Sequence, residues 1–87
     1  MSDALRLENP AEDTYVLRNI SGHELVNVVV DGSRVGVSTK NLPAGMSLPD
    51  NEGVEFHMYH RGGVPLPRDL YVRWDGAPDW DVIPVPR

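Results

Sequence analysis

The sequence predicts an all-β domain, folded as a two-sheet antiparallel sandwich of the immunoglobulin or fibronectin-III type. Eight glycines and eight prolines punctuate its 87 residues. No stretch of eleven or more residues keeps a helical period without a glycine or proline. Short β-rich runs instead recur at intervals of about ten residues, a spacing typical of sandwiches and barrels. We therefore expect one domain over residues 1–87 with six or seven strands; a small OB-like barrel is the alternative fold.

In the first half of the chain, turn residues separate four candidate strands. Leu5 to Leu7 alternates apolar and polar residues, although residues 1–12 are also a candidate for a loose N-terminal arm. Asp31-Gly32 is a pair typical of hairpin turns, and Gly36 suggests a bulge or an edge position. The other three expected strands are 14–20, 25–31 and 34–37.

The second half alternates strands with irregular loops. Residues 41–53 contain two prolines and two glycines, which predicts a loop crossing between the sheets. A second irregular loop is expected over 61–69. Pro84 and Pro86 place the end of the last strand at a sheet edge. The expected strands are 54–60, 70–75 and 80–85.

Side chains alternate between the two faces of a strand, so each strand offers one apolar row to the core. In GVEFHMYHR, the row from Val54 to His60 faces inward, whereas Glu55, His57 and Tyr59 face outward. Applied to every strand, this rule predicts a core of Tyr15, Leu17, Val26, Val28, Val30, Val54, Phe56, Met58, Leu70, Val72, Trp74 and Val82.

Composition excludes several classes of protein. The chain has no cysteine, so it cannot form disulfides, thiolate zinc sites or a cysteine nucleophile. Its formal net charge of −5 disfavours binding to nucleic acid. The longest apolar run, residues 25–30, is far shorter than the roughly 20 residues that span a bilayer. The start of the sequence lacks the pattern of a signal peptide. We therefore expect a cytoplasmic or virion protein with no membrane or nucleic-acid partner.

No catalytic, cofactor or metal site is predicted. His57 and His60 fall on opposite faces of one strand, and a metal needs three or four converging ligands. Asp50, Asn51 and Glu52 form only part of a calcium-loop pattern. No serine lies in a nucleophile motif. Asn19-Ile20-Ser21 matches a glycosylation triplet, which also arises by chance. We therefore expect a protein that is not an enzyme and carries no cofactor.

The best candidate for function is a set of aromatic and basic residues that face outward, together with Trp80, which could belong to the core or serve as a surface anchor. Tyrosine, tryptophan and arginine are enriched at the energetic centres of protein interfaces. The candidate partner-binding residues are His57, Tyr59, Tyr71, Arg73 and Trp80. Whether they are adjacent depends on the strand order. They predict a protein partner, with self-association included.

Three segments carry a family resemblance: YVLRNISGHELVNVVVDG, NLPAGMSL and VEFHMYHRGGVPLPRDLYVRWDG, followed by a closing VIPVP. They resemble small immunoglobulin-like or fibronectin-III-like proteins of actinobacteria and their phages. The matching positions are Leu17 and Asn19, Pro43 and Gly45, and Val72 and Trp74, within residues 14–86. The extended SLPDNEG loop departs from that pattern. The resemblance implies the fold and transfers no activity.

Three functional hypotheses follow. The first is a non-enzymatic interaction or structural module, such as a phage virion decoration or accessory protein, or a small adaptor. The second is an acidic inhibitor, anti-defence protein or nucleic-acid mimic that blocks a partner's basic site. It requires the acids at 50, 52, 55, 75, 79 and 81 to gather on one face. The third, an enzyme or small-ligand binder using His57, Tyr59 and Tyr71, requires those polar groups to converge.

Overall fold

The computed structural model describes residues 3–60 and 62–86. Within them the chain forms eight strands and a single turn of 3-10 helix, Gly32–Arg34. The strands are β1 (Leu5–Ala11), β2 (Thr14–Asn19), β3 (Leu25–Val30), β4 (Ser38–Lys40), β5 (Ala44–Leu48), β6 (Gly53–Tyr59), β7 (Asp69–Arg73) and β8 (Asp81–Pro84). The all-β prediction is confirmed, whereas the expected count of six or seven strands is wrong.

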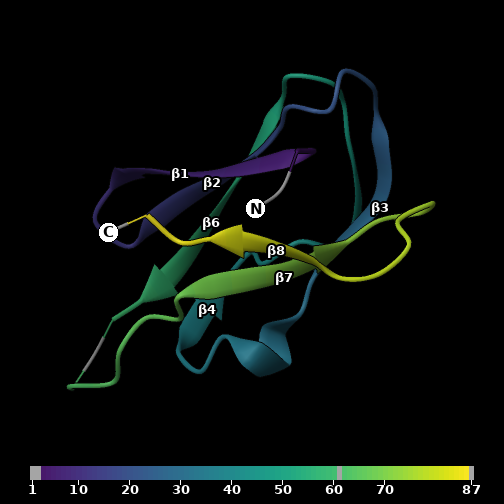
Figure 1. The fold of residues 1–87 in the computed structure, drawn as a ribbon. Coiled ribbons are helices and arrows are strands. Elements are labelled where there is room, and N and C mark those ends of the chain that lie inside the picture. Colours follow the sequence, from purple (N-terminus) through teal and green to yellow (C-terminus); the bar gives the residue numbers. More distant parts are fainter. Residues whose placement is uncertain (1–2, 61, 87) are drawn as a thin grey trace.

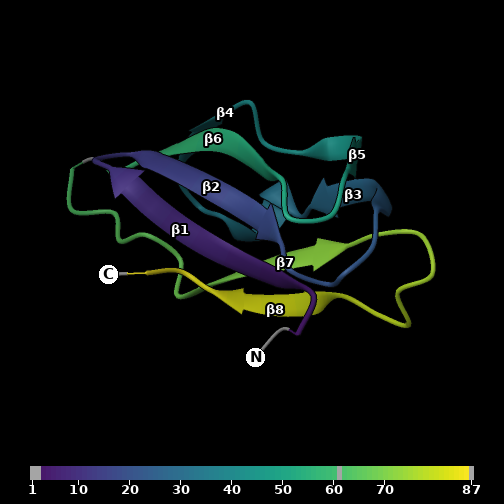
Figure 2. The same cartoon turned by 90° about the horizontal axis from the view of Figure 1, so that it is seen from above.

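The strands form two antiparallel sheets of four (Figure 1). The first sheet has the order β1-β2-β6-β4 and the second has the order β5-β3-β7-β8. Figure 2 shows the two layers, with β1, β2, β6 and β4 on one side and β3, β7 and β8 on the other. The core lies between them. Each sheet therefore has one inner face and one outer face.

Alternation in β2, β6 and β7 follows the sequence prediction. On β2, Tyr15 and Leu17 are buried, and on β6, Phe56 and Met58 are buried. Leu70 and Val72 of β7 complete the same core from the second sheet. The expected alternation is therefore confirmed in these strands. It was predictable because a strand with one buried face has a strongly specified register.

Val26 was expected in the core, but it is 45% exposed. The pairing of β3 with β5 shifts register between Leu25 and Val28, and Asn27 adopts a left-handed φ of +59°. This bulge inserts an extra residue, so the side chains on its two sides no longer alternate simply. Leu25 and Val28 are consequently buried, whereas Val26 and Asn27 lie outside.

Three other expected core residues are only half-buried. Ile83 of β8 and Val85, just beyond the strand, are the buried residues, one position out of phase with the prediction. Val82 therefore pairs with Tyr71 on the outer face. Trp74 follows the end of β7, and Val54 lies near the start of β6; both pack on the edge of the core. The differences at Trp74 and Val54 arise near strand ends, where alternation constrains a side chain least.

The middle of the chain differs most from the prediction. The expected strand at 34–37 is absent, and Asp31-Gly32 begins the 3-10 turn instead of a hairpin. Residues 38–40 form β4 at the edge of the first sheet. The expected loop at 41–53 contains β5, which pairs with β3. Pro43 does not prevent this, since its carbonyl accepts a hydrogen bond from the Val30 amide at 2.9 Å.

The segment considered as a loose N-terminal arm contributes a full strand to the first sheet. Leu5 to Ala11 pair with β2, and Leu5 and Leu7 are buried. At the other end of the chain, β8 is an edge strand and ends at Pro84, as the prolines predicted.

Asn19 is the one buried polar residue of the described core. Its Nδ2 donates to the carbonyls of His23 and Leu48, at 2.7 and 2.9 Å, and its Oδ1 accepts from the amide and hydroxyl of Ser21. It therefore links the end of β2 to β5 of the opposite sheet. Nδ2 is the atom that would carry a glycan in the Asn19-Ile20-Ser21 triplet. In this fold the buried atom instead donates these hydrogen bonds, so Asn19 has a structural role.

Candidate functional site

The five sequence-predicted partner residues lie on two different sheets. His57 and Tyr59 are on the outer face of β6, and their rings stack with centroids 6.0 Å apart. Tyr71 and Arg73 are on the outer face of β7, and Trp80 lies just before β8. Because the outer faces point in opposite directions, the five residues form two groups. For the same reason His57 and Tyr59 cannot converge with Tyr71 on one ligand.

The outer face of the first sheet is a network of charges that satisfy one another. Glu8 accepts from Arg6 at 2.7 Å and from Arg18 at 3.1 Å. The hydrogen bond from Arg6, followed by that from Arg18, lowers the pKa of the Glu8 carboxyl. On this face the arginine charges are already paired with a carboxylate.

Beside this network, Thr14, His57 and Glu55 form a row that resembles a nucleophile, base and acid. Thr14 Oγ1 lies 3.4 Å from His57 Nδ1, and Glu55 Oε1 lies 3.8 Å from His57 Nε2. Both distances exceed the roughly 2.6–3.2 Å of working catalytic hydrogen bonds. The row also lies on an open sheet face, where water screens its charges. Its geometry does not match that of a catalytic triad.

The outer face of the second sheet pairs arginines with aromatic rings. The Arg34 guanidinium carbon lies 4.3 Å from the centroid of the Tyr71 ring. The Arg73 guanidinium carbon lies 5.3 Å from that of Trp80. Both separations are within the range of cation–π attraction. We call Arg34, Tyr71, Arg73 and Trp80 the aromatic–arginine patch.

Asp31 fixes the position of Arg34. Its carboxylate caps the 3-10 turn by accepting from the Ser33 amide and hydroxyl, and it accepts from Arg34 Nε at 3.2 Å. The Ser33 hydroxyl is the largest of the causes that lower the pKa of the Asp31 carboxyl. Since the Asp31 amide also donates to the Tyr71 carbonyl at 2.9 Å, turn and strand are joined directly.

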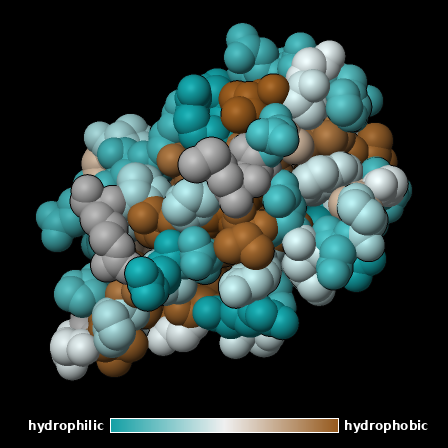
Figure 3. All heavy atoms as spheres, viewed as in Figure 1, coloured by the Kyte–Doolittle hydropathy of each residue, from teal (hydrophilic) through white to brown (hydrophobic). Residues whose placement is uncertain are grey.

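Two valines extend the patch across neighbouring strands. Val29 of β3 lies opposite Arg73, and Val82 of β8 lies opposite Tyr71. Both are half-buried. Apolar side chains beside aromatic and arginine groups are typical of the centre of a protein interface. Figure 3 shows one face of the whole molecule, on which hydrophobic residues are exposed in several places among hydrophilic ones.

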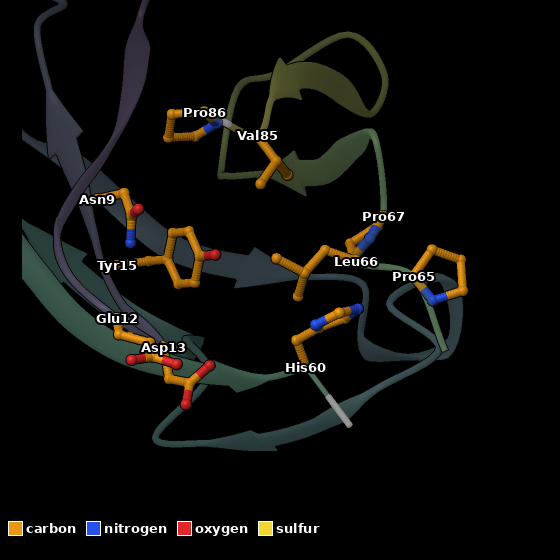
Figure 4. A pocket seen from close by; sticks show the side chains of 10 residues that line it. All are labelled: Asn9, Glu12, Asp13, Tyr15, His60, Pro65, Leu66, Pro67, Val85 and Pro86. Atoms are coloured by element: carbon orange, nitrogen blue, oxygen red, sulfur yellow. The ribbon is translucent and has the colours of Figure 1, made fainter. Parts of the chain in front are cut away.

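A separate pocket, the end pocket, lies at one end of the sandwich and has a volume of about 390 Å³ (Figure 4). Its walls are Asn9, the turn residues Glu12 and Asp13, Tyr15, His60, the loop residues 65–67, and Val85 with Pro86. His60 was expected at the end of the inward row of β6. It lies just beyond that strand and is exposed.

Other predicted groups stay dispersed. His23 lies in the β2–β3 connection, His57 on the outer face of β6 and His60 at the end pocket. Across residues 3–60 and 62–86, no three His, Cys, Asp or Glu side chains gather as metal ligands. The acids named for an inhibitor do not share a face, because Glu55 points outward from β6 whereas Asp81 lies opposite the inward Val72 in the second sheet. No helix in the described part of the chain is long and apolar enough to cross a membrane.

Sequence reasoning missed Arg34 and the end pocket. Arg34 was assigned to a strand, although Asp-Gly-Ser before it is also a pattern that starts a helical turn, because an aspartate accepts from the amide two residues on. The pocket residues come from four separate segments, and Tyr15 was assigned to the core alone. No local pattern connects them.

Comparisons of this chain with protein-family models, with curated proteins and with solved structures found no match. The aromatic–arginine patch and the end pocket are therefore interpreted from their own chemistry.

Proposed function

We propose that this chain is a non-enzymatic, immunoglobulin-like or fibronectin-III-like module that binds a protein partner through the aromatic–arginine patch. The observation that carries the proposal is the stacking of two arginines on aromatic rings on one sheet face. Three of the five sequence-predicted residues, Tyr71, Arg73 and Trp80, belong to this group. Residues of these types dominate the binding energy of protein interfaces.

The strand order supports the immunoglobulin-like part of the proposal. Immunoglobulin constant domains have sheets ABED and CFG, and variable domains add C′ beside C. Here β1-β2-β6-β4 corresponds in order to ABED, and β3-β7-β8 to CFG, with β5 in the place of C′. The difference is that β4 precedes β5 along the chain. Such modules present sheet faces and end loops to partners.

Arg73 of the patch favours a partner that offers carboxylates. A guanidinium stacked on a ring keeps its N–H groups in the plane, where they can bind a carboxylate with two hydrogen bonds. Within the described residues Arg73 forms no ion pair with a carboxylate. The patch thus offers a positive group between apolar side chains on a protein whose net charge is −5.

In its biological setting, we propose that the module serves as a virion decoration or accessory protein of a phage, or as a small adaptor. Light scattering coupled to size-exclusion chromatography separates the two. A stable oligomer of the isolated chain favours the structural role, and a monomer favours the adaptor. Arg73→Glu should dissociate an oligomer that forms through the patch.

Selection of a random peptide library on the immobilised protein tests the proposal and does not require that the partner be identified. We expect the enriched peptides to contain Asp or Glu beside apolar residues. Their affinity should fall about thirtyfold for Arg73→Ala or Trp80→Ala, a loss of about 2 kcal/mol typical of interface hot spots. The control variants are Arg18→Ala and Tyr59→Ala on the opposite face. Peptides that lose affinity for the controls instead would overturn the proposal.

A further inference from the structure

The end pocket combines a polar floor with an apolar wall. Figure 4 shows Tyr15 entering from one side, with its hydroxyl directed toward Leu66 and His60, and the Glu12 and Asp13 side chains below it. Loop residues 65–67 and Val85 form the apolar side. Its volume of about 390 Å³ is within the range of small-molecule sites.

Tyr15 is 3% exposed, and its ring stacks on Phe56 with centroids 6.1 Å apart. Its hydroxyl forms no hydrogen bond with another residue of 3–60 or 62–86. In this part of the chain no side-chain nitrogen or oxygen that is sealed from solvent lacks a partner, so the Tyr15 oxygen is reached from the pocket. A hydroxyl in an apolar setting is costly to bury without a hydrogen-bond partner. A ligand in the pocket can supply that bond.

The charges at the pocket select the sign of the ligand. Glu12 and Asp13 are consecutive acids in the β1–β2 turn, which Asn9 braces by donating to the carbonyls of Ala11 and Thr14. Burial, followed by the negative charge of Asp13, raises the pKa of the Tyr15 hydroxyl. The hydroxyl is therefore protonated at neutral pH, and its oxygen can accept from a cation. An anion would meet two carboxylates.

We propose that the end pocket binds an organic cation, an alkylammonium or alkylguanidinium group whose apolar stem lies against Leu66 and Val85. Such a group is carried by a free amine or by a lysine or arginine side chain. It would donate to the Tyr15 oxygen and to the Glu12 and Asp13 carboxylates. This site is independent of the aromatic–arginine patch, so either proposal can fail without the other.

NMR titration of the ¹⁵N-labelled protein with four probes of similar shape tests the proposal: butylammonium, butylguanidinium, 1-butanol and butyrate. At physiological salt, the two cations should shift the amides of residues 12–15, 60, 66 and 85 with saturation. The alcohol and the acid should bind at least about tenfold more weakly. Equal binding of butyrate or butanol, or shifts located elsewhere, would overturn the proposal.

Two variants separate the groups. Tyr15→Phe keeps the ring on Phe56 and removes only the hydroxyl, and Glu12→Gln with Asp13→Asn removes the charges. Asparagine suits position 13 because the residue there has a left-handed φ of +60°. Both should weaken cation binding about tenfold or more. The charge-matched control is Glu24→Gln with Glu52→Gln, two exposed acids outside the pocket lining. If the control loses as much cation affinity, the effect comes from the net charge of the protein and the proposal is contradicted.

Blocked tripeptides Gly-Lys-Gly and Gly-Arg-Gly identify the source of the cation. Binding tighter than that of butylammonium assigns it to a partner's side chain. Weaker binding, with the free cations still saturating, assigns it to a free amine. Both outcomes support the pocket chemistry.

Discussion

The outer faces of the two sheets use arginine in different ways. On the first sheet, Arg6 and Arg18 both donate to Glu8, so each already has a carboxylate acceptor within the protein. On the second sheet, Arg34 and Arg73 lie over Tyr71 and Trp80. Arg34 also pairs with Asp31, whereas within the described residues Arg73 pairs with no carboxylate. A guanidinium paired with a carboxylate has its strongest acceptor already, whereas one stacked on a ring retains donors for a partner. This difference is the reason why we propose the second face as the interface.

The largest effect on stability is expected from loss of the Asn19 hydrogen bonds, which link the two sheets. Asn19→Ala removes the hydrogen bonds to the His23 and Leu48 carbonyls and leaves those groups without their partner. We expect a loss of about 3 kcal/mol in the free energy of unfolding, measured by urea denaturation. Ile20→Ala, at the exposed neighbouring position, should cost well under half as much. Equal losses would show that Asn19 does not hold the sheets together.

A second substitution separates charge from stacking. Arg73→Lys keeps the positive charge but loses the planar group over Trp80, so library-selected peptides should bind about tenfold more weakly, as isothermal calorimetry can measure. The corresponding Arg18→Lys should leave their affinity within about twofold, because we place it outside the interface. If Arg73→Lys binds like the unmodified protein, charge alone explains the patch.

The smallest expected effect is a difference in how the pKa values of Glu8 and Asp31 respond to salt. Glu8 owes its lowered pKa first to Arg6 and Arg18, whereas Asp31 owes it first to the Ser33 hydroxyl. Salt at about 1 M shortens the screening length to roughly 3 Å. The pKa of Glu8 should therefore rise toward its ordinary value in salt, while that of Asp31 stays lowered. NMR titration of the side-chain carboxyl carbons measures both, and a parallel rise would contradict the assigned causes.

The same shifts give the direction of the pH dependence. A folded-state pKa below the unfolded value means that the charged carboxylate favours the folded state. The stability it contributes is present at neutral pH and is lost as the pH falls through the folded pKa. We expect the free energy of unfolding to fall in acid as Glu8 and Asp31 are protonated. Glu8→Gln should reduce this pH dependence in low salt.

The sequence predicted the two-sheet fold and the central strands because one-sided burial enforces their alternation, as Phe56 and Val72 illustrate. It failed where one residue changes the phase. The bulge at Val26–Asn27 and the one-residue offset at Val82 both exchange inner and outer faces. β5 was missed because Pro43 and Gly45 resemble loop residues, although neither prevents its pairing with β3.

The candidate sites were predictable to different degrees. Tyr71 and Arg73 were named as candidates from residue type and alternation, and Trp80 from residue type alone. Their separation from His57 and Tyr59 required the strand order, which no local pattern fixes. The end pocket required contacts between residues as distant as Asn9 and Pro86.

Chemical-shift mapping of a selected peptide on the ¹⁵N-labelled protein tests the central claim most directly. We expect the largest amide shifts at residues 29, 34, 71–73 and 80–82, and no saturating shifts at residues 14–18 or 55–59. Peptide-induced shifts concentrated on the outer face of β2 and β6 would contradict the proposed interface and would assign recognition to the face whose charges we find already paired.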